Sequence, residues 1–238
     1  PGQRVLGTAV AVDGDGRAWG FWAARDGDNW DSFARARSAG KWSSPIRVSG
    51  AKGSDVFPAA TTDAKGRAWV AWQSLGDSSA DILAATQRGE GFAAPEVVSA
   101  TDANEWEPAI AASADGQVAI AWDTYGAGNY DVKVRVWAGG AWGEPLVVTR
   151  SLEGEARPSL AFDARNRLWV AYEVAPENWG KDFGPYDYAP NRTALYQNRS
   201  VGLRVLEGSR WLAPGPQPAE AFPATRAKPG AGDRKSVV

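Results

Sequence analysis

Three acidic residues recur at a fixed spacing, and they are the first side chains in this chain that suggest chemistry. Asp55, Glu105 and Glu155 lie 50 residues apart, and each stands three positions before a proline. Carboxylates that a repeat array brings to one place are suited to a hard cation such as Ca²⁺. The alternative is that each carboxylate caps its own loop, in which case they bind no cofactor. The spacing by itself leaves both interpretations open.

A second candidate region lies between Tyr172 and Ser200, which are separated by 27 residues where the equivalent Trp122 and Asp131 are separated by 8. Insertions in a repeat array form loops on one face, often the binding face. We predict that this 19-residue insertion docks a sugar or a partner domain, because it mixes aromatic rings with carboxylates. Its ligand-binding candidates are Trp179, Asp182, Tyr186, Asp187 and Tyr188. The alternative is a loop that covers its own repeat.

The amino-acid composition argues against several kinds of catalytic site and binding partner. The chain has no His and no Cys, so the usual zinc sites and imidazole acid–base catalysis are unavailable to it. Its net charge of −2 and the lack of a basic run argue against nucleic acid as a partner. No apolar stretch is long enough to insert into a bilayer. A cysteine-free chain suits the cytosol or an exported bacterial protein, and we expect a periplasmic or extracellular one.

These candidate residues belong to an internal repeat of 50 residues. Turn residues recur at Asp13, Asp63, Ser113 and Asp163, and large aromatic residues follow each of them at Trp22, Trp72, Trp122 and Tyr172. Units of about 40 to 50 residues that hold several strands are typical of β-propeller blades. The sequence therefore predicts an all-β fold, a partial β-propeller of four four-stranded antiparallel blades with a tryptophan-rich core between them.

The second unit illustrates the expected strands. Residues 58–62 are small and suit an innermost strand, and residues 67–72 form a continuous apolar run that is typical of a strand buried on both faces. Asp63 and Gly66 between them predict a tight turn. Residues 81–86 and 92–99 complete the blade as its third and outer strands.

The repeat divides the chain as follows: residues 1–7, the end of a preceding blade; 8–57, 58–107 and 108–157, one blade each; 158–214, a blade with the insertion; and 215–238, the start of a further blade or a linker. The chain begins at Pro1 without a methionine, and we expect it to be a fragment of a longer, metagenomic bacterial protein. Residues 233–238 correspond to one reading frame of a common sequencing adapter, so we expect them to be artefactual.

The turn before the outer strand resembles that of the sialidase-like β-propeller superfamily. The resembling segments keep a glycine and an aromatic residue but lack the aspartate of that superfamily's Asp-box: residues 38–42, 88–92, 138–142 and 207–211. The resemblance implies the fold. A sialidase would also need an arginine triad, a Tyr/Glu pair and an acidic residue at the inner blade ends. Only Arg157 matches faintly, since Phe57 and Glu107 occupy the equivalent positions, and no catalytic residue is assigned.

Residues 177–206 resemble, more narrowly, the N-terminal propeller region of large bacterial proteins that end in a phosphoesterase-like domain of unknown function. This likeness would place any chemistry outside the chain. We therefore predict a non-catalytic binding or scaffold module of a larger exported protein, with carbohydrate or a neighbouring domain as its partner. The alternative is a fragment of a sialidase-like glycan-processing enzyme whose catalytic blades lie elsewhere.

Overall fold

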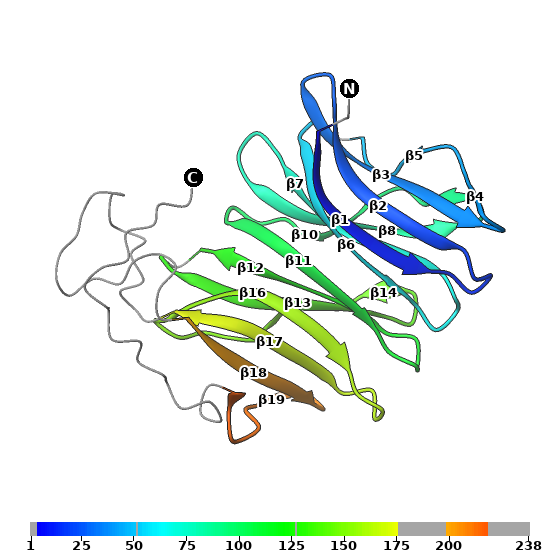
Figure 1. Cartoon of the computed structure of the whole chain (residues 1–238). Coiled ribbons are helices and arrows are strands. Elements are labelled where there is room, and N and C mark those ends of the chain that lie inside the picture. Colours follow the sequence, from blue (N-terminus) through cyan, green and yellow to red (C-terminus); the bar gives the residue numbers. More distant parts are fainter. Residues whose placement is uncertain (1–3, 51, 127, 176–198, 219–238) are drawn as a thin grey trace, which may run out of the picture.

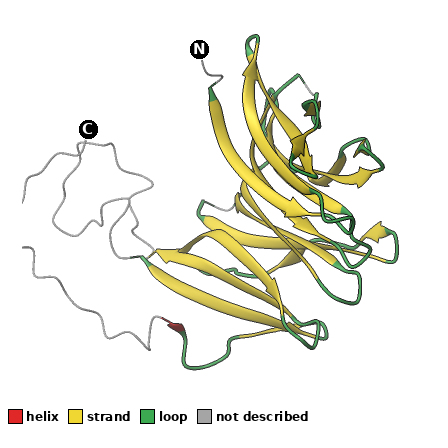
Figure 2. Ribbon diagram, turned by 45° about the vertical axis from the view of Figure 1, so that its right-hand side comes forward, coloured by secondary structure: helices red, strands yellow, loops and turns green. Residues whose placement is uncertain are grey.

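The protein forms four antiparallel β-sheets arranged as a fan (Figure 1). The computed structural model describes residues 4–50, 52–126, 128–175 and 199–218. Within these ranges, no helix is long and apolar enough to cross a membrane. Each sheet comes from one repeat unit, and Figure 2 shows the sheets side by side as successive layers. The predicted all-β architecture of four antiparallel blades is confirmed.

Hairpins connect neighbouring strands, so sequence order is largely spatial order. The first sheet contains β1 (Val5–Val12), β2 (Ala18–Asp26), β3 (Asn29–Ser38), β4 (Lys41–Trp42) and β5 (Ile46–Arg47). The second contains β6 (Ser54–Thr62), β7 (Ala68–Leu75), β8 (Ala80–Arg88), β9 (Gly91–Phe92) and β10 (Glu96–Ser99). The third contains β11 (Asn104–Ala112), β12 (Val118–Tyr125), β13 (Tyr130–Ala138), β14 (Ala141–Trp142) and β15 (Leu146–Val147). The fourth contains β16 (Gly154–Phe162), β17 (Leu168–Ala175), β18 (Ser200–Glu207) and β19 (Arg210–Leu212).

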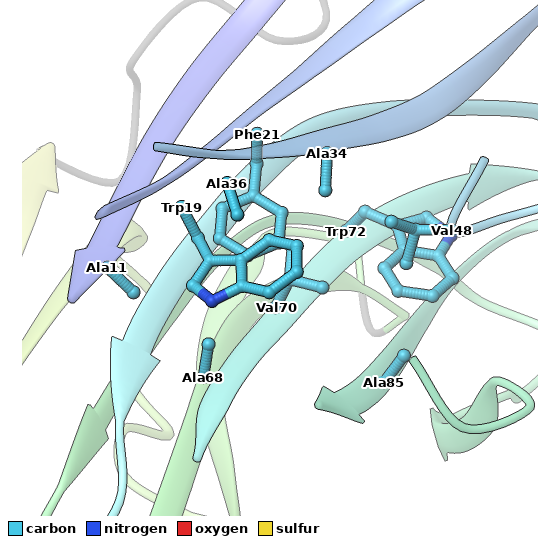
Figure 3. Packing of buried hydrophobic residues seen from close by; sticks show 10 residues of the cluster. All are labelled: Ala11, Trp19, Phe21, Ala34, Ala36, Val48, Ala68, Val70, Trp72 and Ala85. Atoms are coloured by element: carbon cyan, nitrogen blue, oxygen red, sulfur yellow. The ribbon is translucent and has the colours of Figure 1, made fainter. Parts of the chain in front are cut away.

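The core lies between successive sheets. Between the first and second sheets, Trp19 and Phe21 of β2 face Val70 and Trp72 of β7, with alanines filling the spaces around them (Figure 3). The second strands of the two middle sheets are buried on both faces, which is why they are apolar at consecutive positions. Trp72 and Trp122 are among the most buried side chains. The prediction that the tryptophan columns form inter-blade packing is confirmed for these two residues.

The innermost strands are longer than the sequence predicts. β6 begins at Ser54 rather than at Pro58, and β1 begins at Val5, so residues 5–7 belong to the first blade and not to a preceding one. The register slips by one residue in each innermost strand, at a bulge directly before the positions of Thr8, Pro58, Pro108 and Pro158. The sequence predicted that the strand begins at the proline, because proline cannot donate a hydrogen bond to the neighbouring strand. In the structure the bulge leaves that position unpaired, so the strand continues through the proline.

The outer strand also differs from the prediction. Residues 92–99 form two short strands, β9 and β10, that both pair with β8, and Pro95 lies in the interruption. The same division occurs in the first and third sheets, where a short outer pair flanks Pro45 and Pro145. The missing amide of proline explains why the outer strand is not continuous.

Candidate functional site

A cavity of about 300 Å³ opens where the second, third and fourth sheets meet, at the starts of their innermost strands. Arg199 lies directly before β18, and the other lining residues come from the first, second and third strands of these sheets: Phe57, Gln73, Trp106, Glu107, Asp123, Tyr130, Gly154, Ala156, Arg157 and Glu173. The set combines aromatic rings, carboxylates and guanidinium groups. Such a mixture is typical of a ligand pocket, and the volume lies at the lower end of the usual range of 300–1,000 Å³.

The bulges of the innermost strands place three of these side chains. Phe57, Glu107 and Arg157 have left-handed backbones with φ of +53°, +49° and +53°. A non-glycine residue in this conformation costs roughly 1–3 kcal/mol, and such residues cluster at functional sites. The bulge in each of these three sheets therefore places one side chain in the lining of the cavity, and the equivalent Gly7 of the first sheet has φ of +74°, so the left-handed backbone belongs to the bulge of every repeat.

The second strands place the partners of the bulge residues. Gln73, Asp123 and Glu173 each pair with the residue that directly precedes a bulge. Asp123 and Glu173 thereby lie beside Glu107 and Arg157 in the lining of the cavity. Two structural positions per repeat, the bulge and its cross-strand neighbour, supply the polar groups of the site.

Arg157 joins the carboxylates of two sheets. Its Nε donates to Oε2 of Glu107 at 3.1 Å, and its Nη1 lies 3.4 Å from Oε2 of Glu173. The Glu107 carboxylate is the largest influence that raises the pKa of Arg157. All three side chains are partly exposed, so this ion-pair network can exchange protein contacts for contacts to a ligand.

Asp123 differs from the two glutamates because it is buried, with 4% of its surface exposed. Burial, reinforced by the nearby charge of Glu107, raises the pKa of Asp123 to about 8. Its Oδ1 has no hydrogen-bond partner among the described residues. At neutral pH this carboxyl group therefore holds a proton and can donate it in a hydrogen bond, while Glu107 and Glu173 accept.

Aromatic side chains form one wall of the cavity. The rings of Trp106 and Tyr130 lie 5.4 Å apart, and Tyr125 extends the group at 5.0 Å from Tyr130. Aromatic faces bind the apolar faces of sugar rings and hold them at low entropic cost. The cavity thus has a stacking surface on one side and a hydrogen-bonding network on another.

The positions that line this cavity are those at which the repeats diverge. The bulge position is occupied by Gly7, Phe57, Glu107 and Arg157, and its cross-strand neighbour by Ala23, Gln73, Asp123 and Glu173. Turn and core positions keep their residue type far better. This divergence is a signal that sequence reasoning could have used, because a position that serves only packing stays similar from repeat to repeat.

A larger cavity of about 670 Å³ lies at the opposite ends of the innermost strands. Its charged groups serve the turns. The Oδ2 atom of Asp63 accepts from the Trp69 indole at 2.9 Å and from Arg67 Nε at 2.8 Å, and its Oδ1 accepts from two backbone amides. Asp13 and Asp163 make the same contacts in their turns. The prediction that these aspartates are turn residues is confirmed, and we assign this cavity a structural role.

The metal candidates Asp55, Glu105 and Glu155 lie inside the innermost strands and not on connections, each at a different junction between sheets. Glu105 and Glu155 accept hydrogen bonds from Thr101 and Ser151 in the preceding connection, both at 2.7 Å. Asp55 accepts from the Trp72 indole at 2.9 Å. Within the described ranges, no three His, Cys, Asp or Glu side chains are grouped as a metal site requires.

The insertion candidates Trp179, Asp182, Tyr186, Asp187 and Tyr188 lie outside the described residues, as do residues 219–238. Glu173 and Arg199 stand on either side of residues 176–198 in the sequence, and both line the smaller cavity. A ligand-binding role for the insertion stays a prediction.

Comparison with solved structures identifies the architecture. The chain is similar to the Hadza microbial sialidase Hz136, with a TM-score of 0.59 and 11% identity over 90% of this chain and 47% of that one. It is similar to the α-L-arabinofuranosidase Arb93A from Fusarium graminearum, with a TM-score of 0.56 and 15% identity over 85% and 62%. The fold is that of a β-propeller. Likenesses at this identity show the fold alone, and no family model or curated protein sequence matches the chain.

The chain spans about half the length of some of these propellers. A protein of unknown function from Dyadobacter fermentans DSM 18053 matches with a TM-score of 0.56 and 15% identity, over 69% of this chain and 48% of that one. The comparisons support the predicted β-propeller fold, and membership of the sialidase-like superfamily stays a prediction. The narrower likeness to proteins with a phosphoesterase-like domain stays a prediction.

Proposed function

We propose that this propeller binds a neutral carbohydrate in the cavity between its second, third and fourth sheets. The observation that carries the proposal is the convergence of three bulge residues of different type, Phe57, Glu107 and Arg157, on one cavity. A non-catalytic binding module for glycans accounts for the aromatic wall and the hydrogen-bonding groups together.

The charge pattern favours a neutral sugar over an acidic one. Arg157 already pairs with Glu107 and Glu173, so its guanidinium group is engaged by two carboxylates. A sugar hydroxyl can donate to a carboxylate oxygen and accept from a guanidinium N–H without adding charge. A sugar carboxylate would instead be repelled by both glutamates.

Titration calorimetry with a panel of oligosaccharides tests the proposal. Neutral arabino-oligosaccharides and acidic sialylated oligosaccharides are suitable probes, because the structural neighbours include an arabinofuranosidase and a sialidase. We expect a neutral probe to bind and Glu107→Gln to weaken binding by about tenfold, which corresponds to about 1.4 kcal/mol. Glu144→Gln, an exposed carboxylate outside the cavity, is the matched control and should bind as wild type.

Three results would contradict the proposal or a part of it. One is the absence of binding to any neutral probe at millimolar concentration. Another is equal affinity in Glu107→Gln, Glu144→Gln and wild type, which would place the sugar elsewhere on the molecule. Stronger binding of the sialylated probes would contradict the preference for a neutral sugar.

A second candidate function is glycoside hydrolysis, favoured by one observation. Asp123 keeps its proton at neutral pH and lies beside Glu107 and Glu173, which both pair with Arg157. Two carboxyl groups with different roles are the arrangement that glycosidases use. Release of nitrophenol from aryl glycosides would support hydrolysis if Asp123→Asn abolished the rate while sugar binding persisted. The rate should also fall above about pH 8, where Asp123 loses its proton. No turnover by the wild type would remove this candidate.

A further inference from the structure

Most of the buried side-chain atoms without a hydrogen-bond partner, within the part of the chain that the structure describes, lie at one recurring position between successive sheets. At this position a carboxyl group from the first strand of one sheet lies in the field of an aspartate on the third strand of the sheet before it. The unpartnered atoms are Asp31 Oδ1, Asp55 Oδ2, Glu105 Oε2, Trp122 Nε1, Thr124 Oγ1, Asp131 Oδ1 and Glu155 Oε2. At the junction of the second and third sheets they include the donor Trp122 Nε1 as well as acceptors, so a single ligand can satisfy several of them.

Glu105, Trp122 and Thr124 share one face of the third sheet. Glu105 pairs with Thr124 across β11 and β12, and Trp122 stands two residues before Thr124 on β12, so the three side chains point to the same side. Trp122 packs with Ile82 and Val98 of the second sheet, so this side is the junction with the second sheet. Glu105 and Trp122 are fully buried and Thr124 is 3% exposed. The three unpartnered atoms therefore lie in a place that bulk solvent does not reach.

The equivalent position between the first and second sheets shows which contacts these atoms require. There Oδ1 of Asp55 accepts from the Trp72 indole at 2.9 Å, and the hydroxyl groups of Ser74 and Ser49 also hydrogen-bond this carboxyl group. Asp55, Trp72 and Ser74 are the equivalents, 50 residues earlier, of the three residues above, and Asp55 pairs with Ser74 in the same register. In the second sheet one short carboxyl group therefore serves the indole and the hydroxyl together.

A glutamate at this position in the third sheet removes the direct contact. The Glu105 side chain is one methylene longer than that of aspartate, and its Oε1 accepts from Thr101 at 2.7 Å in the connection before β11. Ser99 also hydrogen-bonds this carboxyl group. The Trp122 indole and the Thr124 hydroxyl thereby lose the acceptor that an aspartate supplies, and Oε2 of Glu105 has no donor. One substitution in the repeat leaves a donor, a hydroxyl and an acceptor unpaired on the same face.

The chemistry of the three atoms selects the ligand. The polar hydrogen of the Trp122 indole repels a metal cation, and Glu105 together with the nearby Asp81 disfavours an anion. The ligand takes the place that the Asp55 carboxyl group holds one junction earlier, so it is no larger than a carboxyl group. Water both donates and accepts, which suits the Glu105 carboxyl group in either protonation state, and buried waters typically make about three hydrogen bonds.

We propose that the junction of the second and third sheets binds one buried water molecule, which accepts from Trp122 Nε1 and joins it to Glu105 Oε2 and Thr124 Oγ1. The water ties the first strand of the third sheet to the second, as the Asp55 carboxyl group does in the second sheet. Asp123 stands between Trp122 and Thr124, so its side chain points to the opposite face, where it lines the carbohydrate cavity. The water site is therefore separate from that cavity, and the two proposals stand independently.

Nuclear magnetic resonance of the ¹⁵N-labelled 238-residue chain tests this inference. Rotating-frame Overhauser cross peaks between water and an indole N–H proton report a bound water beside that ring. Trp122→Phe and Trp72→Phe assign the two indole signals. We expect a cross peak to water at Trp122 and none at Trp72, whose N–H donates to Asp55. Trp72 is the matched control, because the Ser74 hydroxyl stands at the position of Thr124 and would relay a signal by exchange equally well.

Exchanging the two acidic side chains provides reciprocal variants. Glu105→Asp should bring a carboxyl group to the Trp122 indole, as in the second sheet, and the water cross peak at Trp122 should disappear. Asp55→Glu should create the same site one junction earlier, and a water cross peak should appear at Trp72. Circular dichroism melting checks that each variant is folded. If a variant fails to fold, a wild-type crystal structure that resolves ordered waters decides, by density within hydrogen-bond distance of all three atoms.

Three outcomes overturn the inference. The first is a wild type without a water cross peak at Trp122. The second is a cross peak of equal intensity in wild type and in folded Glu105→Asp, which would place the water on other atoms. The third is a crystal structure in which the Trp122 N–H donates directly to a protein atom.

Discussion

Replacing Asp63 by alanine should destabilise the second sheet strongly, because one carboxylate organises a whole turn. Its oxygens accept from the Trp69 indole, from Arg67 Nε and from the amides of Lys65 and Arg67, at 2.8–2.9 Å. The Arg67 side chain is 36% exposed, so most of the cost comes from the buried Trp69 indole and the two backbone amides, and each buried donor left without an acceptor typically costs about 1–3 kcal/mol. The four bonds share one acceptor and are not additive, so we expect Asp63→Ala to lower the free energy of unfolding by about 3–5 kcal/mol.

The orphaned indole N–H gives this prediction a second measurement. Trp69 is buried, and alone Trp69→Phe should cost about 1–2 kcal/mol through the lost hydrogen bond and the smaller ring. In the Asp63→Ala background the indole has already lost its acceptor. Trp69→Phe should then cost about 1 kcal/mol less, which a double-mutant cycle measures directly.

Urea unfolding followed by far-UV circular dichroism is a suitable assay, since it follows the β-sheets and does not rely on the fluorescence of the tryptophan being replaced. Asp77→Ala, an exposed aspartate after β7, is the control and should change stability by less than about 0.5 kcal/mol. A cost below about 1 kcal/mol for Asp63→Ala would refute the reasoning. An equal cost of Trp69→Phe in both backgrounds would show that the indole bond contributes nothing.

The pH dependence of the wild type provides an independent check. Burial alone would raise the pKa of Asp63, but hydrogen bonds from Trp69 and Arg67 outweigh it and hold the pKa below 3.8. A lowered pKa means stability that is present above the unfolded value of about 4 and is lost as the pH falls through the folded value. Stability should therefore fall below pH 4 in the wild type, and less steeply in Asp63→Ala.

Three further predictions concern buried groups at the junctions and in the cavity. Trp122→Ala should lower the free energy of unfolding by about 3–5 kcal/mol. In urea titrations Trp122→Phe should lower it by less than Trp72→Phe does. The reason is that the Trp72 indole donates to Asp55, whereas the Trp122 N–H has no partner among the described residues. Burial raises the pKa of Glu105, so its ionisation destabilises the native state as the pH rises above about 4; Glu105→Gln should remove that loss, and identical pH profiles of the two proteins would contradict the assignment. Burial likewise raises the pKa of Asp123 to about 8, so the stability gained by Asp123→Asn relative to wild type should widen between about pH 4 and pH 8 and then level off, and a constant difference in melts across this range would mean that Asp123 is ionised in the native state.

The fold could be predicted from the sequence because the same local signals for turns and strands recur in each of the four repeats. Each turn needs a residue such as Asp63 to accept backbone amides and a residue such as Gly66 that tolerates positive φ, and both requirements are local. The continuous apolar run of β7 indicates burial on both faces without any knowledge of the neighbours. Sheet number, strand order and the tryptophan core follow from these signals.

Local signals also misplaced some features. The proline at position 58 suggested the start of a strand, whereas a bulge lets β6 continue through it to Ser54. Asp55, which was expected in a connection, therefore lies inside the buried strand β6. There the Trp72 indole and nearby hydroxyl groups surround its carboxyl group. The register at a bulge depends on pairing with the neighbouring strand, which the sequence of one strand does not contain.

Only the tertiary structure decided which residues form the cavity. Glu107, Asp123, Arg157 and Glu173 lie on two different sheets and, taken singly, are ordinary charged residues of a repeat. Arg157 looked isolated in the sequence because Phe57 and Glu107 stand at its equivalent positions, yet the fan of sheets brings Arg157 and Glu107 to 3.1 Å from each other. Periodicity reports what the repeats share, whereas the site is made from the positions where they differ and depends on how successive sheets pack.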